Sequence, residues 1–388
     1  MNKRVYFLMI VSFVIGMVEL IISGILDLIA DDLHITLGQA GFLITIFSLI
    51  FAIGGPILLV TTAKVERKKL TLMNLFIFLI GNIVTVLSTN YAMALAGRII
   101  SGLSGALLVI LCLVMAPSMV EPKYRGRAIG TISMGVSGSL VLGVPIGLML
   151  GNAFGWRAPF ILISCLTVLS IIGVYFLMEK VEPKAYAPLS KMMASLKGQK
   201  IFFAQATTFL YMTGHTVLYA YFKPFIQTTT GLEGTWISII YFLFGIAAVS
   251  GGGIGGTLAD LFGTKRTILT SIFIFSIVFF VLPFMTGILP LFFVGIVIWG
   301  CLSWAISPAM QSYLIDNAPD TADVQQSLNN SSLHLGVAVG SLIGGYVIET
   351  FSVEQNALVG GILITLSLIT AILSTRSKPL GKTNAVKV

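Results

Sequence analysis

The sequence predicts an all-α integral membrane protein in which twelve transmembrane helices form two pseudo-symmetric six-helix bundles. Three observations lead to this fold class. Of the 388 residues, 56% are hydrophobic and only 10% are charged, whereas about 25% are charged in soluble domains. Twelve apolar runs are each long enough to cross a hydrocarbon core of about 30 Å. A polar break at residues 179–200 separates the first six runs from the last six.

The twelve runs follow one another with short turns between them, as at Glu121-Pro122 and Gly151-Asn152. They comprise residues 5–29, 40–62, 70–89, 92–118, 128–151, 157–178, 201–227, 236–258, 267–286, 289–315, 325–349 and 355–375. The first run is too long for a signal peptide and lacks a small-residue cleavage site, so we expect it to be retained. The predicted units are an N-terminal bundle at 1–178, a cytoplasmic linker at 179–200, and a C-terminal bundle with a short cytoplasmic tail at 201–388.

The basic residues predict the orientation, because Lys and Arg are enriched in cytoplasmic loops. With the N-terminus inside, all but three of the 23 basic residues fall in cytoplasmic segments; the exceptions are Arg98, Arg157 and Lys223. Both termini are then cytoplasmic, and the protein is expected in the plasma membrane. The net charge of +8 reflects this sorting, so no nucleic-acid partner is expected. One chain can form a whole pathway, so a monomer in the lipid bilayer is expected.

The sequence offers little for metal, cofactor or enzyme chemistry. The three cysteines, Cys112, Cys165 and Cys301, all lie in apolar runs, which argues against a disulfide framework. His215 and His334 lie in different runs, without carboxylate or thiolate companions at metal-binding spacing. No HExxH, GxSxG or nucleotide-binding loop occurs. We therefore expect no metal, no cofactor and no enzymatic activity.

Two glycine triplets and two basic loops mark an internal repeat. The loops, residues 63–69 and 256–266, lie six runs apart, although each can equally be an ordinary cytoplasmic loop. Small residues four apart let helix backbones approach closely. The triplets are Gly143, Gly147 and Gly151 in the fifth run, with Pro145 between them, and Gly336, Gly340 and Gly344 in the eleventh.

Four short motifs carry a family resemblance. The loop after the eighth run reads GxLAD followed by GxKR, through Gly256, Leu258, Ala259, Asp260, Gly263, Lys265 and Arg266. Its mate after the second run keeps Arg67 and Lys68 but has Ala63 and Glu66 in place of Asp and Gly. The others are Arg98-x-x-x-Gly102-x-x-Gly105, Gly143-Val-Pro145-Ile-Gly147 (near the antiporter motif GPxxGG) and Phe154-Gly-Trp-Arg157. Together they resemble the major facilitator superfamily, and are most similar to its twelve-span drug:proton antiporter branch, which includes arabinose-efflux-type permeases.

Polar residues in the first run recur at intervals of 4, 3, 4 and 4, namely Ser12, Gly16, Glu19, Ser23 and Asp27. On a helix these positions fall within an arc of roughly 80°. A carboxylate that faces lipid costs a few kcal/mol. The stripe is therefore expected to face the protein interior or a wet cavity.

We hypothesise that Glu19, Asp27 and Arg98 form a proton-coupling group. Arg98 lies in depth between the two acids, at about 1.5 Å per helical residue. Burial and an approaching guanidinium change the proton affinity of a carboxyl group in opposite directions, so helix rearrangement can load and release a proton. The resemblance implies the same roles, since related antiporters use acids in span 1 and an arginine in span 4. A static salt bridge and direct binding of a cationic substrate are the alternatives; Asp27 can also be a solvated residue at a helix end.

Three further stripes are predicted to line a central substrate cavity, because each lies on one face of its helix. For every residue, a satisfied hydrogen bond between helices is the alternative. The histidines can also take part in proton coupling, because imidazole titrates near neutral pH. The stripes are Thr208, Tyr211, His215 and Tyr219 in the seventh run, Trp304, Pro308 and Gln311 in the tenth, and Gln326, Asn330 and His334 in the eleventh.

In the family, the loop after span 2 and its mate after span 8 contact neighbouring helices and hold one side closed. Asp260 begins such a contact, and its replacement by Asn is expected to weaken the gate. For residues 64–69, where the Asp is missing, a role in orientation alone is the alternative. The resemblance implies a gating role for Arg67, Lys68, Gly256, Asp260, Gly263, Lys265 and Arg266.

The sequence as a whole predicts a secondary active transporter that exports a small organic molecule, such as a drug, sugar or nucleoside, in exchange for protons by alternating access. A proton symporter or facilitator for sugar or nucleoside uptake is the runner-up. Outside transport, a membrane sensor with a transporter fold is the alternative. The stripes are neutral, so they do not identify the substrate.

Overall fold

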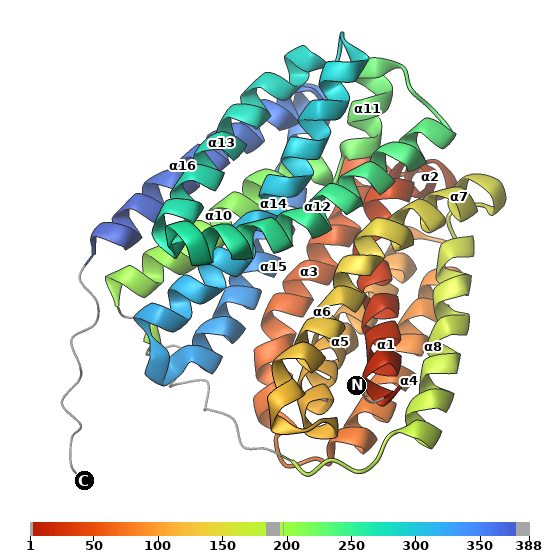
Figure 1. The fold of residues 1–388 in the computed structure, drawn as a ribbon. Coiled ribbons are helices and arrows are strands. Elements are labelled where there is room, and N and C mark those ends of the chain that lie inside the picture. The colour runs from red at the N-terminus through yellow and green to blue at the C-terminus, as the bar shows by residue number, and fades with distance from the viewer. Residues whose placement is uncertain (1–2, 184–194, 197, 378–388) are drawn as a thin grey trace.

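The computed structural model describes residues 3–183, 195–196 and 198–377, and the regular structure of these residues is entirely helical (Figure 1). Residues 184–194 and 197 of the predicted linker and 378–388 of the tail lie outside the described residues. The first half comprises α1 (Lys3–Leu20), α2 (Ile22–Leu33), α3 (Leu37–Thr61), α4 (Arg67–Val86), α5 (Tyr91–Met115), η1 (Ala116–Met119), η2 (Pro122–Tyr124), α6 (Arg125–Gly138), η3 (Ser139–Gly143), α7 (Val144–Phe154) and α8 (Ala158–Leu177). The second comprises α10 (Gln199–Tyr219), α11 (Phe222–Thr230), α12 (Thr235–Phe262), α13 (Thr264–Met285), α14 (Leu289–Asn317), η4 (Pro319–Thr321), α15 (Ala322–Thr350) and α16 (Gln355–Arg376).

Ten helical stretches among the described residues are long and apolar enough to cross a membrane, and α1 with α2 adds a pair bent by 48°. The seventh predicted span is present as α10 and α11, which are not among these ten. Pro224 lies in the first turn of α11, where its missing N–H is tolerated, so the second helix of this span starts there. The predicted fold class is confirmed, with spans 1 and 7 each broken into two helices.

The glycine triplets pack in the same way in both halves. Each faces the first span of its own half, and an added Cβ would lie within 2.8 Å of the partner residue in every case. Span 5 thus lies on span 1, and span 11 lies on span 7, so the internal repeat is visible in the packing. The contacts are Gly143 with Met17, Gly147 with Ile21 and Gly151 with Ile25, then Gly336 with Phe209, Gly340 with Thr213 and Gly344 with Val217.

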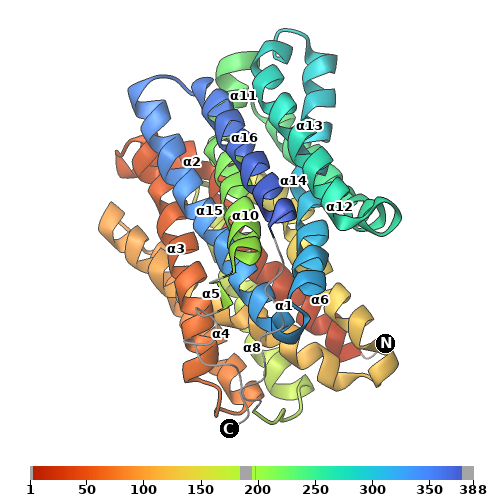
Figure 2. The same ribbon diagram turned by 90° about the vertical axis from the view of Figure 1, so that its left-hand side faces the viewer.

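The two halves meet along a seam. Helices α3 and α15 run side by side in Figures 1 and 2, and α2 lies against α11. Span 5 contains a π-helical turn, η3, followed by Pro145 in the first turn of α7. Such turns are rare and occur often at functional sites. This one lies against α12 of the other half, where a Cβ on Gly245 would be only 2.7 Å from the Cα of Val141.

The predicted loop at residues 256–266 is mostly helical, which corrects the expectation from the sequence. Helix α12 continues to Phe262, so Gly256 and Asp260 lie inside it, and α13 begins at Thr264. The residues between 257 and 262 include good helix formers and no proline, so nothing ends the helix earlier. Only Gly263 separates the two helices, with a φ of 87° that favours glycine.

Candidate functional site between the two halves

Glu19 lies near the middle of span 1 and faces the other half of the molecule. Its Oε1 is 3.2 Å from Nδ1 of His334 on α15, and the two side chains are 17% and 7% exposed. The atoms are at ion-pair distance but lack hydrogen-bond geometry. The His334 ring also packs against Phe51 of α3, with centroids 4.1 Å apart and ring planes tilted by 32°. A carboxylate from one half and a titratable imidazole from the other therefore meet at the seam.

Arg98 is fully buried, but it does not pair directly with Glu19 as the sequence suggested. Its Nη1 donates to the carbonyl of Val18 at 2.8 Å, and its Nε donates to the carbonyl of Leu43 at 3.3 Å. The guanidinium also lies 4.0 Å from the ring centroid of Phe47. The reason is the break after α1, which leaves the last carbonyls of that helix without intrahelical donors. Arg98 satisfies one of them, and it attracts the Glu19 carboxylate from nearby without direct contact.

Asp27 pairs with Lys223 on α11 of the other half, which corrects two expectations. Nζ of Lys223 donates to Oδ1 of Asp27 at 2.7 Å, and the side chains are 4% and 25% exposed. Asp27 therefore neither joins Arg98 nor is freely solvated. In the sequence, Lys223 stands out only as a basic residue outside the loops. The missed signal was the one basic residue of the seventh run, which lies at the same end of its span as Asp27 does in span 1.

Hydrogen bonds between the halves continue on both sides of this pair. The hydroxyl of Tyr241 on α12 donates to the carbonyl of Ser23 at 3.0 Å. Along the contact between α3 and α15, two hydroxyl side chains from each half form hydrogen bonds with the other half. These bonds are Thr36 to the Glu349 carboxylate, Ser341 to the Gly41 carbonyl at 2.9 Å, Thr45 to the Ala338 carbonyl at 3.1 Å and Ser331 to the Ala52 carbonyl at 2.9 Å.

The stripe predicted in span 7 is buried in the packing of the second half and does not line an open cavity. Nδ1 of His215 accepts a hydrogen bond from Nε1 of Trp299 at 3.0 Å. The His215 ring stacks on Tyr219 with centroids 5.2 Å apart, and both lie beside Phe244. Tyr211 is also buried. Aromatic rings gain from tilted and edge-to-face packing, which explains why this face of α10 is closed in this conformation.

On α15 the buried Gln325 and Asn329 each lie one position before the predicted Gln326 and Asn330, whereas the predicted His334 is itself buried. Asn329 donates to Oε1 of Gln205 at 3.1 Å and to Oγ1 of Thr208 at 2.8 Å, whereas Asn330 is exposed. The reason is helical periodicity, because Asn329 lies seven residues before Gly336 and shares its face toward α10. The face of α15 that carries Gly336, Gly340 and Gly344 packs on α10. Polar residues on that face, such as Asn329, and those opposite on α10, such as Gln205, could therefore have been predicted from the glycine spacing. On α14, Trp304 is half-buried and Gln311 is exposed.

Glu66, which stands where the family motif has glycine, caps the N-terminus of α4. Its carboxylate accepts hydrogen bonds from the backbone N–H groups of Lys68 at 2.7 Å, Lys69 at 2.8 Å and Val181 at 3.0 Å. Burial acts to raise the pKa of Glu66, but these donors outweigh it and lower the pKa from its ordinary value of 4.5. The side chain thus ties the segment after α8 to the start of α4.

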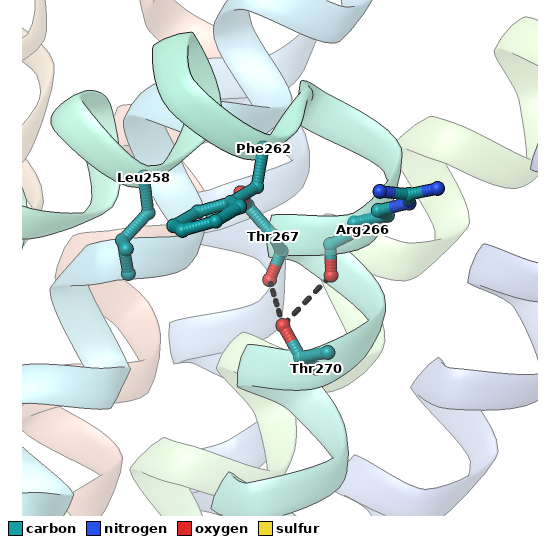
Figure 3. A pocket seen from close by; sticks show the side chains of 5 residues that line it. All are labelled: Leu258, Phe262, Arg266, Thr267 and Thr270. Atoms are coloured by element: carbon teal, nitrogen blue, oxygen red, sulfur yellow. Dashed lines mark hydrogen bonds between the residues drawn. The ribbon is translucent and has the colours of Figure 1, made fainter.

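The other predicted gating residues are divided between the two halves. Arg67 is fully buried and donates to the carbonyl of Ala63 at 3.1 Å. Asp260 is exposed in the last turn of α12 and forms no ion pair with a described residue, so the contact expected of it is absent from this conformation. Lys265 is exposed too. Arg266 lines a pocket of about 270 Å³ at the turn between α12 and α13, together with Leu258, Phe262, Thr267 and Thr270 (Figure 3).

Two repeated helical halves, with side chains of span 1 paired across the seam, define a polytopic protein of the secondary-transporter class. Among the described residues, no group of three His, Cys, Asp or Glu side chains could hold a metal ion. The sequence profile described as Major Facilitator Superfamily matches residues 8–323 and 206–387. The chain belongs to this superfamily and is one of its transporters.

Relatives and solved structures agree with this assignment. The chain is 33% identical over 376 residues to the uncharacterized MFS-type transporter YbcL of Bacillus subtilis, covering 97% of this chain and 96% of the relative. It is 26% identical over 379 residues to the inner membrane transport protein YdhP of Escherichia coli, covering 97% of each. The fold matches a bacterial homolog of the human lysosomal transporter Spinster in an inward-facing, occupied conformation, with a TM-score of 0.76, 17% identity and 97% of each chain covered.

Proposed function

We propose that the protein is a proton-coupled antiporter that exports a small organic molecule across the cell membrane. The observation that carries this proposal is the position of Glu19, which lies near mid-span, is largely buried and faces His334 of the opposite half at 3.2 Å. An ionised carboxylate held away from water needs compensation. Here a protonated His334 on α15 and the guanidinium of Arg98 on α5 can supply that compensation.

Proton binding at Glu19 changes the energy of the contact between the halves. The ionised carboxylate attracts both Arg98 and a protonated His334, and the neutral acid loses most of that attraction. Arg98 belongs to the same half as Glu19, so this change does not by itself bias the seam. His334 belongs to the other half, so protonation changes the stability of one arrangement of the halves relative to another. A ligand that binds two states unequally shifts their populations, and the proton is that ligand here.

The direction of transport rests on the family resemblance and on the charge distribution. The antiporter-like motif at Gly143, Pro145 and Gly147 supports exchange, and the basic residues support cytoplasmic termini. We infer that residues 1–178 and 201–388 move as two bodies about the linker at 179–200, and that a single chain suffices. Drugs, sugars and nucleosides remain the candidate substrates, with proton symport or facilitated uptake of a sugar or nucleoside as the second possibility.

The test uses inside-out membrane vesicles with an acidified interior and a fluorescent reporter of the pH gradient. Cationic and neutral drugs, sugars and nucleosides are added in turn to vesicles that contain wild type, Glu19→Gln or Asp31→Asn. The last variant is the matched control, because Asp31 is an exposed acid on the same span. Substrate-triggered loss of the gradient in wild type and Asp31→Asn, but not in Glu19→Gln, supports the proposal. An equal response in all three would remove Glu19 from the proton path.

A further inference from the structure

The Asp27–Lys223 ion pair lies outside the proton-coupling centre and joins the two halves at a second place. Asp27 belongs to α2 and Lys223 to α11, the short helices that follow the breaks in the repeat-mates, spans 1 and 7. Both helices lie at the ends of these spans that the sequence predicts to be outside the cell. The pair thus occupies equivalent elements of the two halves, with opposite charges on the two sides.

The surroundings of this pair are closed and hydrogen-bonded. The Tyr241 hydroxyl from the second half donates to the Ser23 carbonyl, one turn before Asp27. On the other side, the hydroxyl of Tyr221 donates to the Ser341 carbonyl at 3.0 Å, and the Ser341 hydroxyl reaches the Gly41 carbonyl of the first half at 2.9 Å. Gly41 has no side chain to obstruct Tyr221, whose ring would collide with an added Cβ. Separation of the halves at this end must break the Tyr241–Ser23 and Ser341–Gly41 hydrogen bonds.

We propose that Asp27 and Lys223 are positioning residues that form a latch on the outer side and set how often that side opens. Two charges 2.7 Å apart with little exposure stabilise the closed seam only while both are present. Removal of one partner leaves the other charge uncompensated, which is strongly unfavourable in a buried site. Opening of the outer side hydrates the remaining charge, so either single neutralisation favours the outward-open state. The latch does not depend on proton coupling and operates in any alternating-access cycle of this fold.

The two neutralisations are expected to differ in size. Lys223 is 4% exposed and Asp27 is 25% exposed, so an uncompensated lysine is the costlier charge in the closed state. Asp27→Asn leaves that lysine, whereas Lys223→Gln leaves the better hydrated carboxylate. Asp27→Asn should therefore shift the equilibrium further toward the outward-open state than Lys223→Gln does.

The experiment measures distances between spin labels on the full-length protein in lipid nanodiscs. Cys112, Cys165 and Cys301 are first replaced by alanine. One label pair, at Thr89 and Glu233, reports the outer side, and another, at Lys64 and Leu261, reports the inner side; all four positions are exposed. In Asp27→Asn the ratio of outward-open to closed molecules should rise about tenfold, within the usual range for coupling between sites. In Lys223→Gln it should rise less, by about threefold, below that range. The outer distance should lengthen and the inner distance should shorten together.

Three controls distinguish a latch from a local structural defect. Lys223→Arg keeps the charge and should keep the wild-type distribution. The double exchange Asp27→Lys with Lys223→Asp should return the distribution toward wild type. Asp32→Asn breaks a pair of equal length, 2.7 Å to Arg157, that lies within the first half, and should leave both distances unchanged. The proposal is overturned if the single variants leave both distances unchanged, if only the outer distance changes, or if the double exchange behaves like the single variants.

Discussion

Span 1 contacts the second half of the molecule through two carboxylates whose partners differ in depth and chemistry. Near mid-span, Glu19 faces His334 at 3.2 Å without hydrogen-bond geometry. Toward the predicted outer end, Asp27 accepts a hydrogen bond from Lys223 at 2.7 Å. An imidazole changes charge near neutral pH, whereas an ammonium and a carboxylate both carry charge at neutral pH in water.

This difference suggests a division of labour between the two pairs. A pair with a titratable member can be made or released by a proton, so it suits coupling. A pair of permanent charges holds until the halves separate, so it suits a latch. The break at Ile21 puts Glu19 on α1 and Asp27 on α2, at an angle of 48°. The two proposed functions therefore reside on separate helices of one span.

The largest effect is expected from Glu19→Gln, which removes the carboxylate of the mid-span pair. Without a group that binds the proton, transport driven by a pH gradient should fall by about 100-fold or more, as for loss of a proton-transfer group. Exchange of substrate against substrate needs no net proton movement and should continue. Uptake assays in liposomes with and without a pH gradient measure both. In Lys223→Gln, by contrast, gradient-driven transport should change in rate but keep its proton-to-substrate ratio.

A smaller effect is expected from His334→Gln, which sharpens the comparison by removing only the titratable partner. Glutamine retains hydrogen-bonding atoms and volume but cannot become charged. Gradient-driven transport should fall about tenfold, with a flatter dependence on pH than wild type shows. The pH profile of initial rates in liposomes provides the measurement. A wild-type profile in His334→Gln would show that His334 is only a packing residue on Phe51.

The glycine contacts allow the packing of span 1 on span 5 to be compared with the packing of span 7 on span 11. An added Cβ at Gly340 meets the backbone carbonyl of Thr213 at 2.4 Å, whereas at Gly147 it meets the end of the Ile21 side chain at 2.1 Å. A side-chain end can rotate away and a helix backbone cannot. Gly340→Ala should therefore lower the free energy of unfolding by about 1–3 kcal/mol and Gly147→Ala by about 1 kcal/mol or less. Thermal unfolding in detergent compares them; equal losses would contradict this reading of the packing.

The smallest effect concerns Glu66, a carboxylate outside the membrane that accepts hydrogen bonds from three backbone N–H groups. Its lowered pKa means that its contribution to stability is present above the ordinary value of 4.5 and is lost as pH falls through the lowered value. Glu66→Gln should cost about 1 kcal/mol at pH 7, as expected for a helix cap. The difference from wild type should shrink below pH 4.5. Hydrogen exchange of residues 179–183 at the two pH values measures it, and a pH-independent difference would exclude the cap.

The fold could be predicted from the sequence, whereas the partners within the site could not. Apolar runs and basic loops act span by span, so they predict the spans before any packing is known. Glu19 was found because a buried acid is conspicuous on an apolar helix. His334 was found through its stripe, but its pairing with Glu19 depends on how the two halves meet. That relation spans 315 positions of sequence and leaves no local pattern.

Local backbone geometry accounts for the other misses. Arg98 was expected to pair with an acid. Because α1 ends at Leu20, the carbonyl of Val18 is available, and Arg98 donates a hydrogen bond to it instead. Lys223 resembled one more basic residue until α11 placed it against Asp27. On α15, a shift of one residue separates exposed Asn330 from buried Asn329. The spacing of polar residues predicts the buried face of a helix only to within one residue. The packing of α15 against α10 determines which of the two residues is buried.

The most direct test of the two-pair account is a pH titration of the outer and inner label distances, without substrate, between about pH 5 and 9. Glu19 and His334 should make the wild-type distribution depend on pH, with Arg98 as the permanent charge nearby. In Glu19→Gln the distribution should no longer respond to pH. In Asp27→Asn it should be shifted toward the outward-open state at every pH but still respond. A full wild-type response in Glu19→Gln would contradict the account, because the proton would then act elsewhere.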